Sequence, residues 1–409
     1  MLDWANQFSI CSFLDGHRYR LREHSFECIV AVNAERILRG AAGRAFEQLQ
    51  AFIDENSDWC FGHLGYDLKN EIEALQSGNA DFVQFDDLFF FVPEMVVILR
   101  SDELLVGVKN REHGSVARAI FNTPPAPARQ PLHIEIKSRF TRDAYIDTVR
   151  QLQQHILHGD CYEINFCQEF YNDNVVIDPL QVYRALSKES PNPFSCYYRL
   201  EDKYLLCASP ERYLRKSGNR LISQPIKGTI PRNNEDKTAD RLNCKTLRHS
   251  AKDRSENIMT VDLVRNDMAK VCKEGSVKVE ELMGIYAFPQ VYQMISTISG
   301  EVEDNTRITD MLKATFPMGS MTGAPKKKVM EFIERYERTQ RGLFSGAAGY
   351  ISPEQNMDFN VVIRSILYNA SNRYLSFPTG SAITYYSRAE DEYEECLLKA
   401  AAIKKVLNS

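Results

Sequence analysis

Hydrophobic and polar positions along the chain follow two different periods, and together they predict a protein that mixes strands and helices. Strand-like runs extend over Ile164 to Phe170, Tyr204 to Ser209, Arg220 to Gln224, Ser345 to Ile351, Met357 to Tyr368 and Tyr374 to Tyr386. Two further runs, Glu94 to Arg100 and Leu104 to Lys109, flank the polar turn Ser101-Asp102-Glu103 and predict a hairpin.

Apolar residues recur at helical spacing in four segments. Thr141 is a suitable cap for a helix whose apolar stripe runs from Tyr145 to Ile156, with an end near Gly159. The other segments run from about Asp236 to Met268 (in two pieces), from Lys326 to Arg338 and from about Glu390 to Leu407. Because strand runs outnumber helices and short turns join most of them, the pattern favours an α+β architecture of antiparallel sheets with helices packed outside.

A proline-rich stretch at 121–131 (FNTPPAPARQP) divides the chain, because its four prolines cannot continue a helix or a central strand. We therefore expect an N-terminal region over 1–120, a linker over 121–131 and a catalytic domain over 132–409.

Composition and charge narrow the functional classes. Of the 409 residues, 44% are hydrophobic and 26% are charged, as in a globular protein, and the formal net charge is −5. A mildly acidic chain without a polybasic run is a poor candidate for binding nucleic acid or a membrane surface. The ten cysteines form no Cys-x-x-Cys pair, and no leader-like segment opens the chain. These features predict reduced thiols and a cytoplasmic location.

Lys227 and Glu211 are the first candidates for chemistry. Lys227 lies at the end of a strand, beside Gly228 and Thr229, and a lysine there acts as a nucleophile when burial lowers its pKa. Two strands joined by the turn Ser217-Gly218-Asn219 would place Glu211 next to it, as an acid/base partner. A surface lysine beside a turn and an ordinary salt bridge remain the alternatives.

Two pairs of carboxylates are spaced to share a helix face. Asp253 and Glu256 are three residues apart on one helix, and Glu392 and Glu395 are three apart on the last helix. If the helices converge, the crowded carboxylates need a cation, and Mg2+ suits oxygen ligands of this kind. The alternatives are an i, i+4 ion pair from Glu395 to Lys399 and a solvated helix face for the other pair.

Two further features suit an anion. A glycine-rich turn that contains Thr322 and Gly323 precedes the helix at Lys326, and free backbone N–H groups in such a turn bind anions. Arg364 interrupts an otherwise apolar strand, where a guanidinium is costly unless it binds an anion such as a carboxylate.

Taken together, these segments resemble the chorismate-utilising enzymes, a family that includes the anthranilate, isochorismate, salicylate and aminodeoxychorismate synthases. The resemblance covers about residues 135–405. It rests on GDCYEINF (159–166), ASPER (208–212), QPIKGTIPR (224–232), ENIMTVDLVRND (256–267), GSMTGAPK (319–326), FSGAAGY (344–350), FNVVIRS (359–365) and EYEECLLKA (392–400).

The resemblance implies a fold and a set of site residues. The fold would be a sandwich of two large antiparallel β-sheets with helices outside. Glu256 and Glu395 would hold Mg2+, supported by Asp253 and Glu392. The anionic substrate chorismate would be bound by Arg364, by Gly228, Thr229 and Gly380, and by Gln293, Thr322 and Gly323.

The resemblance also implies an activity. Lys227 is typical of the aminodeoxychorismate synthases within this family, whose component I converts chorismate and ammonia to 4-amino-4-deoxychorismate for 4-aminobenzoate and folate biosynthesis. The isochorismate and salicylate branch needs a basic lysine where this chain has Glu163. Anthranilate synthases have a histidine at Gln293, and glutamine cannot relay a proton as imidazole does.

The expected reaction uses Glu211 to protonate the departing C4 hydroxyl while Lys227 attacks C2, after which ammonia adds at C4. A glutaminase centre is not expected on this chain, so ammonia would come from a separate glutaminase subunit. The alternatives are a pyruvate-releasing anthranilate synthase component I and a non-catalytic chorismate-binding subunit.

Overall fold

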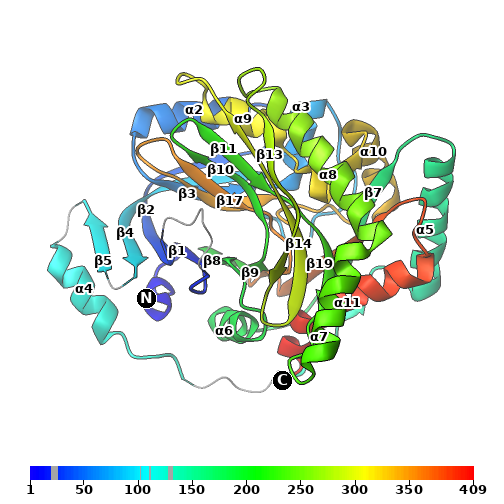
Figure 1. Cartoon of the computed structure of the whole chain (residues 1–409). Helices are drawn as coiled ribbons and strands as arrows, with labels where there is room; N and C mark the ends of the chain where they lie inside the picture. The colour runs from blue at the N-terminus through cyan, green and yellow to red at the C-terminus, as the bar shows by residue number, and fades with distance from the viewer. Residues whose placement is uncertain (20–25, 102, 110–111, 128–131) are drawn as a thin grey trace.

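The computed structural model describes residues 1–19, 26–101, 103–109, 112–127 and 132–409. Asp102 of the predicted turn and residues 128–131 of the predicted linker lie outside this set. The chain forms a layered body in which strands occupy the middle and helices lie around them (Figure 1).

The strands described here join one hydrogen-bonded network in which every pairing is antiparallel. In the N-terminal region they are β1 (Ile10–Asp15), β2 (Cys28–Gly40), β3 (Cys60–Leu64), β4 (Leu88–Arg100) and β5 (Glu103–Val108). The middle of the chain supplies β6 (Lys137–Ser138), β7 (Glu163–Asn172), β8 (Phe194–Leu200), β9 (Lys203–Ser209), β10 (Arg212–Ser217), β11 (Arg220–Gln224) and β12 (Ile226–Pro231). The last strands are β13 (Lys278–Ala287), β14 (Val291–Glu301), β15 (Gly323–Ala324), β16 (Ala347–Ile351), β17 (Met357–Asn360), β18 (Ser365–Asn369) and β19 (Tyr374–Ile383).

Helices surround this network. They are α1 (Leu2–Ala5), α2 (Ala45–Asn56), α3 (Lys69–Glu73), α4 (His113–Asn122), α5 (Arg142–Leu157), α6 (Pro179–Glu189), α7 (Lys237–His249), α8 (Ala251–Ala269), α9 (Ile308–Thr315), α10 (Lys326–Tyr336) and α11 (Ala389–Leu407). Two short 3-10 turns, η1 (Tyr66–Leu68) and η2 (Gly319–Met321), complete the set.

The side chains of single strands divide between two cores, because successive residues of a strand point to opposite faces. In β2, Ile29 and Ala31 enter one core and Val30 and Val32 enter the other. The first core also holds side chains of β3, β10, β16 and β17 together with α2, α8 and α9, so it lies between two sheet layers. The second core is covered by α5, α6, α10 and α11.

The predicted α+β class, with antiparallel sheets and outer helices, is therefore confirmed. The two predicted sheets are the two layers of a single connected network. Strands that precede the proline-rich stretch pair with strands that follow it, since β1 pairs with β8 and β3 pairs with β16. The division of the chain into an N-terminal region and a catalytic domain, separated by a linker at 121–131, stays a prediction.

Most predicted elements are confirmed. Thr141 caps α5 by accepting a hydrogen bond from the backbone N–H of Ala144 at 3.3 Å, and the long predicted helix falls into α7 and α8. The hairpin β4–β5 also forms, with Leu99 opposite Leu104.

The strand predicted over Met357 to Tyr368 is wrong as one element. It breaks into β17 and β18, and Arg364 lies between them with a φ of +53°. A left-handed backbone angle in a non-glycine residue is not visible in a hydrophobic pattern.

All ten cysteines lie in the described residues and are free, and eight of them are buried. Across the described part of the chain, no helix combines the length and apolar character needed to cross a membrane.

Candidate active site

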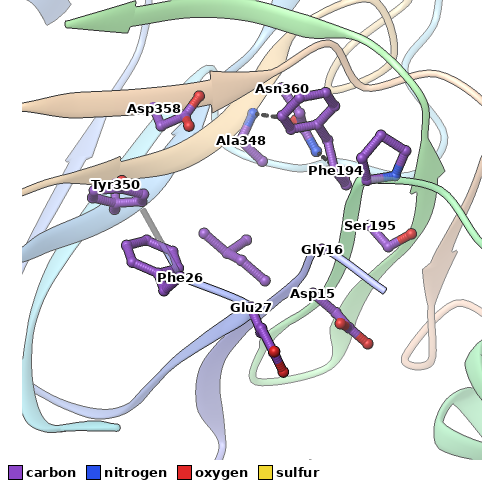
Figure 2. Close-up of a pocket in the computed structure, with 12 residues that line it drawn as sticks. Asp15, Gly16, Phe26, Glu27, Phe194, Ser195, Ala348, Tyr350, Asp358 and Asn360 are labelled. Atoms are coloured by element: carbon purple, nitrogen blue, oxygen red, sulfur yellow. Dashed lines mark hydrogen bonds between the residues drawn. The ribbon is translucent and has the colours of Figure 1, made fainter. Parts of the chain in front are cut away.

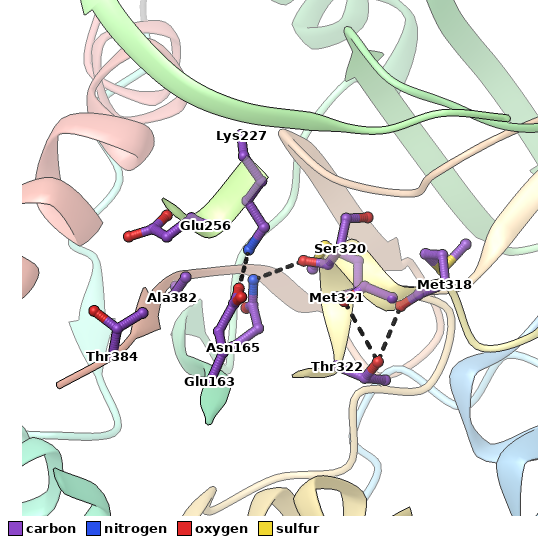
Figure 3. Close-up of polar contacts among 12 residues, drawn as sticks. Glu163, Asn165, Lys227, Glu256, Met318, Ser320, Met321, Thr322, Ala382 and Thr384 are labelled. Carbon is purple, nitrogen blue, oxygen red and sulfur yellow. Dashed lines mark hydrogen bonds and ion pairs between the residues drawn. The ribbon is translucent and has the colours of Figure 1, made fainter. Parts of the chain in front are cut away.

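Lys227 lies inside the protein, on β12. Its side chain is 8% exposed, and its Nζ donates a hydrogen bond to Glu163 Oε1 on β7 at 2.7 Å. Figure 3 shows the amine pointing from β12 onto Glu163, with Glu256 of α8 to one side. The surface-lysine alternative is wrong, because this side chain does not face bulk solvent.

The charge state of Lys227 differs from the expectation. Burial lowers the pKa of the amine, but the carboxylates of Glu163 and Glu256 outweigh burial, and the net shift of the Lys227 pKa is upward. The expectation that burial leaves this amine neutral is therefore wrong for the protein without substrate. Lys227 is an ammonium ion paired with Glu163.

Glu211 lies in the turn between β9 and β10. The predicted hairpin forms, and β10 pairs with β11 so that Arg212 lies opposite Gln224, three residues before Lys227. Glu211 is buried, and its Oε1 accepts a hydrogen bond from Ser320 Oγ at 2.6 Å. Burial raises the pKa of Glu211 to about 7, against the opposing effects of the Ser320 hydroxyl and of Lys227. A carboxyl with this pKa can donate a proton near neutral pH.

The carboxylates of α8 and α11 meet around a lysine that the sequence pattern did not single out. Lys252 Nζ lies 2.7 Å from Glu392 Oε1, 3.3 Å from Glu395 Oε2 and 3.8 Å from Glu256 Oε1. The two helices therefore converge at these side chains.

Each carboxylate in this group has its own electrostatic environment. Burial raises the pKa of Glu256 to about 8, although Lys227 and Lys252 oppose that shift. Burial alone would raise the pKa of Glu395, but the positive charges of Lys399 and Lys252 outweigh burial and lower this pKa to about 2. The predicted ion pair between Glu395 and Lys399 is present, with 2.8 Å between Oε1 and Nζ.

The donor atoms of this group fit a divalent cation in chemistry and burial. Glu256 Oε1 and Glu392 Oε2 are buried and accept no hydrogen bond, so each has free lone pairs. However, no three His, Cys, Asp or Glu side chains in the described ranges already converge as metal ligands. Asp253 instead packs beside Gly228, where a Cβ added to the glycine would lie 2.9 Å from the Asp253 Cβ.

Gly228 and Thr229 follow Lys227 on β12. Gly228 has a φ of +93°, which favours glycine, and Thr229 lies opposite Gln293 of β14. Gln293 is 3% exposed, and its side-chain oxygen has no hydrogen-bond partner within the described residues. An unpaired buried amide oxygen is available to a ligand.

The glycine-rich turn packs directly on β7. Gly323 has a φ of +142°, and a Cβ at this position would lie 2.0 Å from the carbonyl oxygen of Glu163. Thr322 is fully buried, and its hydroxyl donates to the carbonyl of Met318 at 3.2 Å. The turn therefore fixes the strand that carries Glu163.

Arg364 is the predicted anion ligand. Its guanidinium makes no hydrogen bond or ion pair with any described residue, and burial lowers its pKa, with Glu395 opposing. A partly buried guanidinium without a partner suits an anionic ligand. Gly380, which the resemblance also implied, lies on β19 opposite Cys167, and its carbonyl accepts a hydrogen bond from Lys399 at 2.8 Å.

A buried ion pair holds several of these segments in place. Arg341 binds Glu337 at 2.6 Å and donates to the carbonyl groups of Met321 at 2.6 Å and Asn165 at 2.8 Å. It thereby joins the glycine-rich turn to β7. Neither Arg341 nor Glu337 was among the predicted site residues.

A small cavity lies elsewhere, between β1, β8, β16 and β17 (Figure 2). Its volume is about 50 Å³, and its lining includes Asp15, Phe26, Glu27, Tyr350 and Asp358. None of the predicted site residues lines it. It is therefore separate from the group around Lys227.

Comparison with known proteins gives the family. The model of the chorismate binding enzyme family matches residues 13–405. The chain belongs to this family of chorismate-utilising enzymes. The chorismate-binding fold of the family thus spans both regions of the chain, and the enzyme acts on chorismate.

Curated relatives of this chorismate-utilising enzyme have two kinds of names. Aminodeoxychorismate synthase component 1 of Salmonella typhimurium is 35% identical over 84% of this chain and 75% of its own length, and that of Escherichia coli is 34% identical over 85% and 76%. Anthranilate synthase component 1 of Thermus thermophilus is 30% identical over 98% of this chain and 89% of its own length.

Solved structures confirm the fold. Anthranilate synthase component I from Streptococcus pneumoniae superposes with a TM-score of 0.79 and 24% identity, covering 95% of this chain and 94% of that one. The menaquinone-specific isochorismate synthase from Escherichia coli gives a TM-score of 0.79 at 17% identity, covering 99% and 91%.

Proposed function

We propose that this chorismate-utilising enzyme is an aminodeoxychorismate synthase component I, which converts chorismate and ammonia to 4-amino-4-deoxychorismate. The observation that carries the proposal is the buried amine of Lys227, held at 2.7 Å from Glu163 and close enough to Glu211 for the charge of that carboxylate to act on it. A nucleophilic amine and a carboxylic acid are the groups that replacement of a hydroxyl by an amine requires. The names of the relatives from Salmonella typhimurium and Escherichia coli agree with it.

In the proposed reaction, Glu211 donates its proton to the C4 hydroxyl, which leaves as water, while Lys227 attacks C2. Ammonia then adds at C4, and the amine of Lys227 leaves C2. The pKa of about 7 supports Glu211 as the acid, since a large fraction of this carboxyl is protonated at neutral pH. Arg364 would bind a carboxylate of the substrate, because its guanidinium has no partner among the described residues.

The proposed cofactor is Mg2+. Glu256 and Glu395 would hold it with support from Asp253 and Glu392, and a bound cation supplies positive charge that neutralises the ring carboxylate of chorismate. The buried oxygens Glu256 Oε1 and Glu392 Oε2, which accept no hydrogen bond from the described residues, support this assignment.

The proposed ammonia source is a separate glutaminase subunit. The name "component 1" of the relatives implies a second component for those proteins. For this chain the partner would deliver ammonia, and free ammonium would replace it in vitro.

One alternative has specific support. The relative from Thermus thermophilus covers 98% of this chain and is an anthranilate synthase component 1. An anthranilate synthase would release pyruvate. Gln293 favours the first proposal, because the amide does not carry a proton as the expected histidine would.

The test is to incubate the purified chain with chorismate, Mg2+ and an ammonium salt and to identify the product by mass spectrometry. We expect 4-amino-4-deoxychorismate without pyruvate. Anthranilate with an equal amount of pyruvate would establish the alternative. Tight chorismate binding without any turnover would instead indicate a non-catalytic subunit.

A further inference from the structure

Glu163 has features that the proposed reaction does not yet use. Its side chain is 1% exposed, its Oε1 accepts the hydrogen bond from Lys227, and its Oε2 has no hydrogen-bond partner within the described residues. Lys227, as an ammonium ion, has no free electron pair and cannot attack carbon until it loses a proton. The proposed function therefore needs a base in contact with this amine.

We propose that Glu163 is a catalytic residue, the general base that removes the proton from Lys227 before the amine attacks chorismate. The proposal rests on the proposed function of the chain and adds a residue to it. It assigns a chemical role to a position at which the resemblance indicated only a difference from the isochorismate and salicylate branch.

The geometry selects Glu163 from the carboxyl groups that face the amine. Glu163 of β7 is at hydrogen-bond distance from Nζ, whereas Glu256 of α8 and Glu211 of the β9–β10 turn act on Lys227 through their charges alone. Glu211 already accepts a hydrogen bond from Ser320. Proton transfer over 2.7 Å needs no intervening water.

The backbone around Glu163 is held on both sides, so the carboxylate has a fixed position. Glu163 pairs with Ala324 of β15, and the next residue, Ile164, pairs with Ile383 of β19. Gly323 lies so close to the Glu163 carbonyl that no side chain fits between them. A base held in this way is preorganised for the transfer.

The protons balance over the cycle. The Lys227 ammonium gives one proton to Glu163, and the neutral amine forms a bond to C2 while Glu211 protonates the C4 hydroxyl, which leaves as water. Ammonia forms a bond to C4, the C2–nitrogen bond to Lys227 breaks, and the new C4 ammonium returns a proton to Glu211. Glu163 finally returns its proton to Lys227. The sum is chorismate plus ammonia giving the amino product plus water.

Glu163→Gln tests the proposal, because it keeps the size of the side chain and removes the base. We expect kcat for amination to fall about 100-fold at pH 7 while KM for chorismate changes less than threefold. Wild-type kcat should decline above pH 7 as Glu211 ionises. In the variant the neutral fraction of Lys227 grows with pH and offsets that decline, so kcat should stay level between pH 7.5 and 9.

An equal or higher kcat in Glu163→Gln would overturn the proposal, because a mere counter-ion, once removed, leaves more neutral amine at every pH. Glu163→Asp retains a carboxylate and should keep the wild-type shape of the pH profile; a level profile in that variant would also overturn it. Glu169→Gln is the matched control. It removes another buried carboxylate of β7, paired with Arg139 at 2.7 Å, and should leave the profile unchanged.

The outcome is separable from failure of the proposed function. If the wild-type chain yields anthranilate or no product, the proposed function fails. If it yields 4-amino-4-deoxychorismate and Glu163→Gln is as fast, only the role of Glu163 fails.

Discussion

Two groups of side chains in this enzyme, one around Lys227 and one around Lys252, each consist of a lysine among carboxylates. They differ in how far the lysine is exposed to solvent. The side chain of Lys227 is 8% exposed and is hydrogen-bonded to one buried carboxylate, Glu163. The side chain of Lys252 is 32% exposed and lies among Glu392, Glu395 and Glu256. In both groups the surrounding carboxylates outweigh burial and raise the pKa of the lysine.

The difference indicates which cation can be exchanged. The pair of Lys227 and Glu163 is almost completely buried, so we expect its chemistry to be proton transfer within the pair. Lys252 has access to solvent, and its ammonium occupies a position among carboxylates where Mg2+ would compete with it. We therefore expect covalent chemistry at Lys227 and exchange of a cation at Lys252.

The largest expected effect comes from removing the buried amine. Lys227→Met should lower kcat for amination at least 1,000-fold, because neither the nucleophile nor its proton relay remains. The measurement is the rate of product formation from chorismate and ammonium, monitored by mass spectrometry.

Lys69→Met is the matched control, since Lys69 is also buried and ion-paired, to Asp67 at 3.4 Å. Both variants lose a buried ion pair, so thermal unfolding should report similar destabilisation, but the control should remain active. Undiminished amination by Lys227→Met would exclude Lys227 as the nucleophile.

A smaller effect is expected at Lys252 and the carboxylates around it. Lys252→Met removes the resident cation, and the half-saturating Mg2+ concentration should fall about tenfold, equivalent to about 1.4 kcal/mol. Calorimetric titration of the protein with Mg2+ measures this directly, without turnover. Lys399→Met, which removes a lysine that contacts Glu395 alone among these carboxylates, should change the value less. Weaker Mg2+ binding by Lys252→Met would show that Lys252 assists the metal.

The smallest effect concerns the acid. Ser320→Ala removes the hydroxyl that stabilises ionised Glu211, so the pKa of Glu211 should rise above its value of about 7. Since Glu211 acts in its protonated form, the alkaline limb of the kcat profile should move up by less than one pH unit. Ser209→Ala removes a hydroxyl that contacts the backbone of Glu211 and should leave the limb in place. A downward shift would contradict the assignment of Glu211 as the acid.

Much of this architecture follows from local sequence signals. The cap at Thr141 and the strand periods depend on neighbouring residues, and the structure contains the elements that they predict. The pairing of β10 with β11 was also predictable from the short hairpin turn, but the register shift between Arg212 and Arg215, near Glu211, was not.

The remaining features depend on contacts between distant segments. Lys252 lies among other charged residues at the start of α8, and its partners Glu392 and Glu395 lie about 140 residues later in the chain. Glu163 was noted only as a departure from another branch of the family, although the alternation along β7 places it on the same face as Asn165. The raised pKa of Lys227 could not be predicted, since it depends on charges from β7 and α8 that outweigh burial.

The pairing of β1 with β8 and of β3 with β16 has a practical consequence for anyone who wishes to produce a shorter version of this enzyme. A fragment beginning after the proline-rich stretch would expose two unprotected strand edges, and such edges recruit other chains. Truncation at that point should therefore yield aggregates, whereas co-expression of the two pieces should restore solubility.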